Sequence, residues 1–333
     1  MHRIHRRSVV CVAGAIAALC SAASLLAQPS PAAWPTRPLR MIVPFAPGGA
    51  SDIVARIIAP RLSQELGQQV VIDNRAGASG NVGVEIAARA SPDGYTVLLG
   101  NIGTMAINPA IFPDFPVRPV RDFVGVTQIV DVPGALVAHP SVPANTVREF
   151  IAYAKSRPGA LNFGSSGAGS AGRLEMEAFM RAAGISLVHI PYKGGAGAAT
   201  AALLTGEIAV INVSLAAVLP QVRAGKLKAL GVAAIARPGS LPDVPTMVES
   251  GFRDMTTGSW QGVYFPRGTP RPIVDRMFKM ATKIVVEPEV TRRLNEAGAE
   301  VIVSESPEVF AKFMRAQNDR WASVVKRIGL IGE

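Results

Sequence analysis

The sequence predicts an α/β protein with mostly parallel sheets and two domains. Short apolar runs alternate with amphipathic stretches along the whole chain, which is typical of strands connected by helices. Several of these runs end in loops of small residues that lead directly into a helical stretch. Without its N-terminal segment the 333-residue chain keeps roughly 300 residues, somewhat more than one hydrophobic core usually holds.

The first 27 residues have the pattern of a secretory signal peptide. Arg3, Arg6 and Arg7 form a basic start, and an apolar, alanine-rich run over 9–27 follows them. That run is short and only moderately hydrophobic for a transmembrane anchor. We therefore expect export, with cleavage at the end of the run or at Ala33, and with the Sec or twin-arginine route left open.

Removal of this segment changes the chemistry of the chain. Cys11 and Cys20 both leave with it, so the mature chain has no thiol and no disulfide. Three arginines and no acids also leave, which lowers the formal charge from +10 to +7. The remaining basic residues are spread among acids, so the sequence gives no support for nucleic-acid binding.

The apolar runs and their end signals place the secondary structure. In the first predicted helix Pro60 should remove a backbone hydrogen bond and kink or shorten the helix, and Gly67 marks its end. Thr146 and Glu149 form a capping box at the start of another helix, and Gly184 ends a third. The predicted strands are 39–45, 70–74, 95–100, 135–140, 161–166, 187–192, 208–213, 227–234 and 262–266.

The C-terminal part of the chain differs from the rest. It contains three helical stretches, with one strand-like run over 300–304 between the second and the third. Such an end usually packs against a domain that is already built, so we expect the chain to cross between its domains more than once. The helical stretches are 269–285, 288–298 and 306–329.

Catalysis has no support in the sequence. His139 and His189 both lie in strand-like runs, and neither has a second ligand at metal-like spacing, so both are interpreted as structural. The stretch GSSGAGSAG at 164–172 does not match G-x-S-x-G, and a phosphate-binding P-loop motif is missing. We therefore expect no enzymatic activity, no metal and no cofactor.

Four loops of small residues recur after predicted strands. In an open α/β sheet, ligands bind at the carboxyl ends of the strands. Helix N-termini and free backbone N–H groups at these loops would hold an anion without a dedicated arginine. The sequence thus predicts a neutral cleft rich in hydrogen-bond donors, built from PFAPGGASD at 44–52, LLGNIGTMA at 98–106, FGSSGAGSAG at 163–172 and PYKGGAGAA at 191–199.

From about Trp34 to its C-terminus the chain resembles the Bug-type periplasmic solute receptors of tripartite tricarboxylate transporters. Among the matching stretches are WPTRPLRMIVPFAPGGASDIVAR, VVIDNRAGASGNVG, SPDGYTVLLG, HIPYKGGAGA and LPDVPTMVESG. The resemblance implies a class II periplasmic-binding-protein fold, in which crossing strands join two lobes around a ligand. The implied lobes are 34–132 with 262–333, and 133–261.

The resemblance also implies a function. Receptors of this kind are periplasmic and capture small carboxylates, including di- and tricarboxylates, acidic amino acids and aromatic acids, by lobe closure for uptake. We expect a monomer that meets transporter membrane subunits or a sensor protein. An orphan receptor that serves a signalling partner, and less plausibly an α/β hydrolytic enzyme, are the alternatives. Which carboxylate is bound stays open.

The family's ligand-binding loops imply a set of site residues. On one side they are Phe45, Ala46, Pro47, Gly48, Gly49, Asp52, Asn101 and Thr104, and on the other Ser165, Ser166, Gly169, Ser170, Tyr192 and Lys193. We expect Asp52 to fix its loop, because its carboxylate would repel an anionic ligand.

Four departures from the family pattern bear on specificity. Val213 and Ser214 stand where relatives carry an acid, which argues mildly against a ligand with an ammonium group. Met105 replaces a common histidine. Arg173 replaces another, and it either reaches a second carboxylate or lies solvated on a helix surface. Trp260 either walls the cleft or packs between the lobes.

Overall fold

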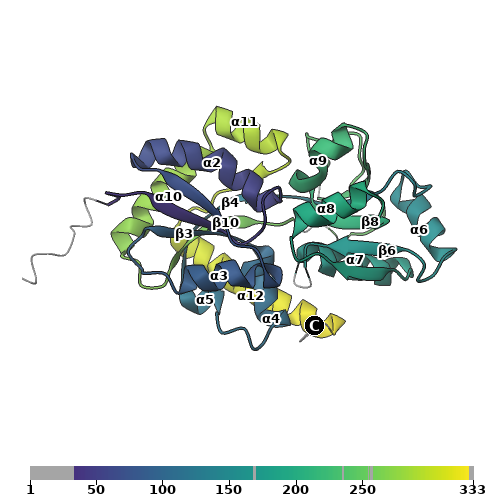
Figure 1. The fold of residues 1–333 in the computed structure, drawn as a ribbon, viewed down its shortest axis with the longest axis horizontal. Helices are drawn as coiled ribbons and strands as arrows, with labels where there is room; N and C mark the ends of the chain where they lie inside the picture. The colour runs from purple at the N-terminus through teal and green to yellow at the C-terminus, as the bar shows by residue number, and fades with distance from the viewer. Residues whose placement is uncertain (1–33, 168–169, 235, 254, 256–257, 330–333) are drawn as a thin grey trace, which may run out of the picture.

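The protein is built from two α/β lobes, each formed around its own sheet (Figure 1). The computed structural model describes residues 34–167, 170–234, 236–253, 255 and 258–329, so the expected signal peptide and Gly169 lie outside the described residues. We call the part on the six-stranded sheet lobe 1 and the part on the five-stranded sheet lobe 2. The two-lobed α/β fold expected from the sequence is confirmed.

The strands of the two sheets come from separate parts of the chain. Lobe 1 has the order β11-β4-β10-β3-β1-β2, with β1 (Leu39–Val43), β2 (Val70–Asn74), β3 (Thr96–Asn101), β4 (Phe123–Asp131), β10 (Gln261–Pro266) and β11 (Glu300–Val301). Lobe 2 has the order β7-β6-β8-β5-β9, with β5 (Gly134–Ala138), β6 (Asn162–Ser165), β7 (Val188–Pro191), β8 (Val210–Ser214) and β9 (Lys228–Ala233).

Both sheets are mixed, so the expectation of mostly parallel sheets is wrong. β10 runs antiparallel to β3 and β4, and β5 runs antiparallel to β8 and β9. These two strands are the ones that enter a lobe from the other lobe, and they therefore start where the neighbouring strands end. Strands β1, β2 and β3 run in one direction, as do β6, β7 and β8. Their carboxyl ends face the space between the lobes.

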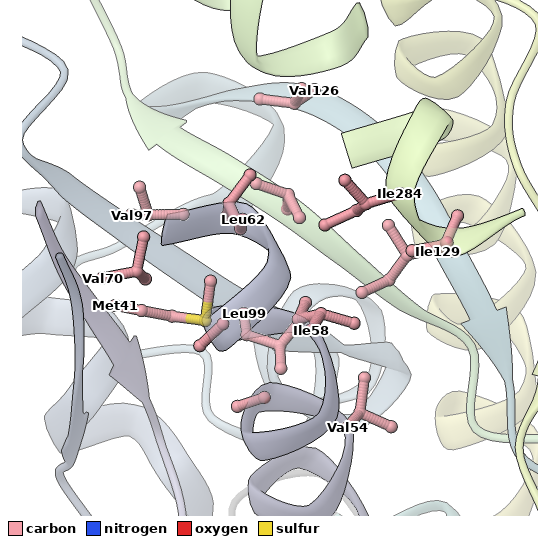
Figure 2. Packing of buried hydrophobic residues seen from close by; sticks show 14 of the residues in the cluster. Met41, Val54, Ile58, Leu62, Val70, Val97, Leu99, Val126, Ile129 and Ile284 are labelled. Atoms are coloured by element: carbon pink, nitrogen blue, oxygen red, sulfur yellow. The ribbon is translucent and has the colours of Figure 1, made fainter. Parts of the chain in front are cut away.

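The sheet of lobe 1 is covered on both faces. Its strands alternate between the faces: Met41 packs toward α2, whereas Ile42 packs toward the opposite layer. Figure 2 shows Ile58 and Leu62 of α2 against Met41 and Leu99 of the sheet. The first layer contains α2 (Ala50–Leu66), α10 (Arg271–Val285) and α11 (Pro288–Glu296), and the second contains η2 (Ala78–Gly80), α3 (Asn81–Ala88), the π-helical turn η3 (Gly103–Ile107), α4 (Asn108–Ile111), α5 (Pro119–Asp122) and α12 (Pro307–Ile328).

Helix α2 continues through Pro60, so the expected shortening at this residue is wrong. Apolar side chains on both sides of the proline, including Val54, Ile58, Leu62 and Leu66, are buried. Their packing outweighs the roughly 3 kcal/mol that a proline costs inside a helix. The helix ends as predicted, with Gly67 in the left-handed conformation at φ 68°.

Lobe 2 has helices on both faces of its sheet as well. The Thr146 hydroxyl accepts a hydrogen bond from the Glu149 backbone N–H, and Gly184 ends its helix with φ 64°, which confirms both predicted signals. The Glu149 carboxylate accepts from the backbone N–H of Asn145. One face carries α6 (Val147–Lys155) and α7 (Ala171–Ala183), and the other carries α8 (Ala196–Leu204) and α9 (Leu215–Arg223).

The chain crosses between the sheets at two places that lie side by side. β4 continues through Val132 into β5, and Ser259 precedes β10 on the return. Val132 and Ser259 exchange backbone hydrogen bonds of 3.3 and 2.7 Å. The two connections therefore form one short ladder between the lobes. None of the described helices combines the length and the apolar character needed to cross a membrane.

Candidate functional site

A cavity of about 60 Å³ lies between the lobes at the carboxyl ends of their strands. Lobe 1 lines it with residues that follow β1, β2 and β3, and lobe 2 with residues that follow β6, β7 and β8. The lining residues are Phe45, Ala50, Ser51, Ser79, Asn101, Ile102, Gly103, Ser166, Ser170, Ala171, Gly172, Ala196, Val213, Ser214 and Ser259. Of the predicted site residues, Phe45, Asn101, Ser166, Ser170, Val213 and Ser214 are among them.

Four helices begin at this cavity. Ser51 lies in the first turn of α2, Gly172 in the first turn of α7, and Ala196 is the first residue of α8. Ser214 is the N-cap of α9. Each helix N-terminus carries partial positive charge and free backbone N–H groups. None of the lining residues, all of them described, has a charged side chain. The cavity is therefore neutral in formal charge and positive in local potential.

The loops of the two lobes contact each other around the cavity through glycines. A methyl group at Gly197 of lobe 2 would lie 3.0 Å from the Pro47 carbonyl oxygen of lobe 1. One at Gly195 would lie 3.5 Å from the Phe45 ring, and one at Gly167 would lie 2.7 Å from the Ser79 hydroxyl oxygen. Only residues without a side chain allow such close approach of the two loops.

Asp52 holds the first loop in place. Its carboxylate accepts hydrogen bonds from the Gly48 backbone N–H at 3.0 Å and from the Asn74 amide at 3.0 Å, and it pairs with Arg56 at 2.9 Å. Burial acts to raise the pKa of Asp52, but hydrogen bonds from Arg56, Gly48 and Asn74 outweigh it and hold the pKa below its ordinary value. Asp52 is outside the cavity lining, as are Ala46, Pro47, Gly48 and Gly49.

Thr104 and Met105 lie behind the cavity wall. Thr104 is fully buried, and its backbone N–H donates to Asn101 Oδ1 at 3.1 Å, while its hydroxyl accepts from the Asn101 backbone N–H. These bonds fix the orientation of the Asn101 side chain, which does line the cavity. Met105 is also fully buried, and a methyl group at Gly100 would lie 2.6 Å from its side chain. Both residues shape the wall from behind.

Ser165 and His189 form a pair that resembles a nucleophile and its base. The two side chains lie 2.8 Å apart, the distance such pairs require. However, the Ser165 hydroxyl is 1% exposed, donates to the Gly167 carbonyl at 3.0 Å and accepts from the Gly167 N–H at 3.2 Å. His189 Nε2 then has to be the donor, since the serine proton is already used. The pair supports the loop.

The remaining predicted residues of lobe 2 lie away from the cavity lining. Tyr192 donates its hydroxyl to Glu207 at 2.6 Å, and burial together with that carboxylate raises the pKa of Tyr192 to about 12. Lys193 is exposed. Arg173 is 6% exposed, so the expectation of a solvated surface arginine is wrong. Its guanidinium lies 3.9 Å from Glu177, one turn further along α7.

Trp260 takes the packing position of the two that were considered. It is 3% exposed, contacts Phe313 edge to face at 5.4 Å and donates its indole N–H to Gln317 of α12. Leu174 of lobe 2 belongs to the same apolar cluster. The tryptophan therefore packs at the junction of the lobes, outside the cavity lining.

Three serines of the cavity were missed by sequence reasoning. Ser51 lies within the first predicted loop, Ser79 follows β2 in the stretch GASG, and Ser259 lies in the return crossing. Ser79 has φ 57°, an uncommon conformation for a residue other than glycine. Its position after a strand was a usable signal, whereas Ser259 is brought to the cavity by tertiary structure alone.

Comparison with known proteins agrees with this geometry. Residues 54–330 match the family described as "Tripartite tricarboxylate transporter family receptor". Protein BugT of Bordetella pertussis is 35% identical over 92% of this chain and 94% of its own length. The chain belongs to this receptor family. It is a solute-binding protein of the TctC type, and the family is not enzymatic.

Solved structures of similar proteins have the same two-lobed fold. The periplasmic binding protein BugD is 34% identical, with a TM-score of 0.85 over 90% of this chain and all of its own. An R. palustris protein solved with adipate is 36% identical, with a TM-score of 0.87 over 90% of this chain and all of its own. MatC from Rhodopseudomonas palustris, solved with bound malate, is 34% identical, with a TM-score of 0.82 over 88% of this chain and all of its own.

Proposed function

We propose that this receptor binds a small carboxylate between its lobes in the periplasm and delivers it to a tripartite tricarboxylate transporter. The observation that carries the proposal is the convergence of four helix N-termini, two lobes and no charged side chain on one cavity. Backbone N–H groups and helix dipoles at such a point stabilise an anion without a counter-ion. The adipate and malate complexes of two relatives support the same ligand class.

Binding would act by shifting a conformational equilibrium. A ligand that touches residues of both lobes gains its full set of contacts only when the lobes are together, so it favours that state. The glycine contacts of Gly167, Gly195 and Gly197 permit this approach. We propose the lobe boundaries 34–132 with 262–333, and 133–261, because both crossings lie beside the Val132–Ser259 ladder. The predicted loop residues are proposed to hold the ligand directly or through the loops they support.

A thermal-unfolding screen of the mature chain tests the ligand class. The protein is unfolded and refolded first, so that any co-purified ligand is removed, and is then heated with small carboxylates, their amides, phosphates and sugars. A carboxylate at one hundred times its dissociation constant should add about 2.7 kcal/mol to the free energy of unfolding. Its amide should add nothing, because the charge that the helix N-termini attract is gone. A response to phosphates or sugars alone would contradict the proposal.

A further inference from the structure

Serine hydroxyls dominate the polar lining of the cavity. Six lining residues are serines, contributed by both lobes and by the return crossing: Ser51, Ser79, Ser166, Ser170, Ser214 and Ser259. The Ser170 hydroxyl caps α7 by accepting from the Arg173 N–H at 3.3 Å. For the other five hydroxyls no hydrogen-bond partner lies among the described residues. Five hydroxyls are thus available to a ligand at one small site.

A carboxylate does not need these hydroxyls. It only accepts hydrogen bonds, and the backbone N–H groups at the four helix N-termini already provide donors. A serine hydroxyl both donates and accepts, so it also suits a ligand group that does both. Ser51 is 3% exposed, so any ligand that fills the cavity without pairing with its hydroxyl leaves a polar group desolvated and unpaired. A purely hydrocarbon backbone would do this.

We infer that the ligand is a small hydroxycarboxylate, whose hydroxyl group or groups pair with the serines while its carboxylate meets the helix N-termini. This inference rests on the proposed function and narrows its substrate class. An amino acid fits less well, because no acidic side chain lines the cavity to balance an ammonium group. An aromatic acid also fits less well, since Phe45 is the one aromatic residue of the lining and about 60 Å³ is a small volume.

Three matched ligand series test the inference by calorimetric titration of the refolded mature chain at one pH. Within each series the ligands differ at one position or in hydroxylation only: propionate, lactate and alanine; succinate, malate and aspartate; hexanoate and gluconate. In at least one series the hydroxy acid should bind about tenfold more tightly than its partners, the effect of one good hydrogen bond. Equal or weaker binding of the hydroxy acid in every series that binds would overturn the inference and leave the carboxylate proposal intact. Silence across all series would reject both.

Serine variants locate the contact. Ser51→Ala and Ser259→Ala remove hydroxyls from lobe 1 and from the return crossing, and Ser250→Ala, whose hydroxyl donates to the Thr246 carbonyl elsewhere in lobe 2, is the matched control. At least one cavity variant should weaken the hydroxy acid about tenfold and leave the deoxy acid unchanged. If both cavity variants weaken the two acids equally, or match the control, the serines do not read the ligand hydroxyl and the inference fails.

Discussion

Glu175 is a fully buried acid beside the crossing between the lobes. Its carboxyl group accepts a hydrogen bond from the Asn212 amide at 2.9 Å. Burial raises its pKa to about 8; the Asn212 bond and Arg320 oppose this shift, whereas Asp131 adds to it. Burial, reinforced by Glu300, also raises the pKa of Asp131, at the end of β4, to about 6. Glu175 is therefore mostly protonated at neutral pH.

This burial makes stability depend on pH in a defined direction. Between the ordinary pKa of 4.5 and the folded value of about 8, the folded state binds more protons than the unfolded state. The free energy of unfolding therefore falls as the pH rises through this window, and the full cost is present above pH 8. Glu175→Gln should remove this fall, by at most about 5 kcal/mol at one pKa unit per 1.36 kcal/mol.

Urea unfolding at pH 5 and pH 9 measures the effect. The parent should lose more stability between these values than Glu175→Gln does, and the control Glu305→Gln, at an exposed position, should follow the parent. An unchanged pH dependence in Glu175→Gln would show that the buried carboxyl group titrates normally.

At the scale of elements, the start of α8 is built for close contact with the other lobe. Gly195 is its N-cap, and Gly197 lies in its first turn beside the Pro47 carbonyl of lobe 1. Within lobe 2, alanine would suit this helix better than glycine by up to about 1 kcal/mol. The glycine is thus explained by the approach of lobe 1.

Gly197→Ala separates the two effects. The variant should be at least as stable as the parent without ligand, but its affinity for the ligand should fall several-fold to about tenfold, because the methyl group opposes the state in which the lobes meet. Thermal unfolding without ligand and calorimetric titration with it give both quantities. Gly239→Ala is the control, since a methyl group there would meet no atom within 4 Å. Equal affinity in Gly197→Ala and the control would contradict this account.

Across the whole molecule, Arg223 connects the lobes away from the cavity. One guanidinium nitrogen donates to the Glu296 carbonyl of lobe 1 at 3.1 Å, and another donates to the Ser240 carbonyl at 3.1 Å. Glu296 is the last residue of α11, where the helix carries partial negative charge. The arginine therefore stabilises the contact of the lobes without lining the ligand cavity.

Arg223→Met should weaken ligand binding about three- to tenfold, the worth of a partly exposed hydrogen bond to a charged group, while the isolated lobes keep their packing. Small-angle scattering should show a larger radius of gyration for the variant at subsaturating ligand. The control Arg157→Met changes an arginine whose side chain contacts its own lobe only through Ser156 and Tyr153. Unchanged affinity and radius would exclude a role for Arg223 in holding the lobes together.

Local sequence determined the parts of this protein that depend on neighbouring residues. The caps at Thr146, Gly67 and Gly184 were predicted because each is an interaction within a few residues of the helix end. The small-residue loops were predicted for the same reason, since a strand, a turn and a helix start are contiguous in the chain. The family resemblance, which spans nearly the whole mature chain, added the two-lobed arrangement.

Tertiary structure decided what depends on distant residues. Helix α2 passes Pro60 because a buried apolar face stabilises both sides of it, and β5 and β10 run against their sheets because the chain re-enters each lobe from the other. Ser259 reaches the cavity through the crossing ladder, and Trp260, the next residue, turns into the core instead. Burial and the direction of approach are properties of the assembled molecule, so adjacent residues with similar sequence signals received opposite roles.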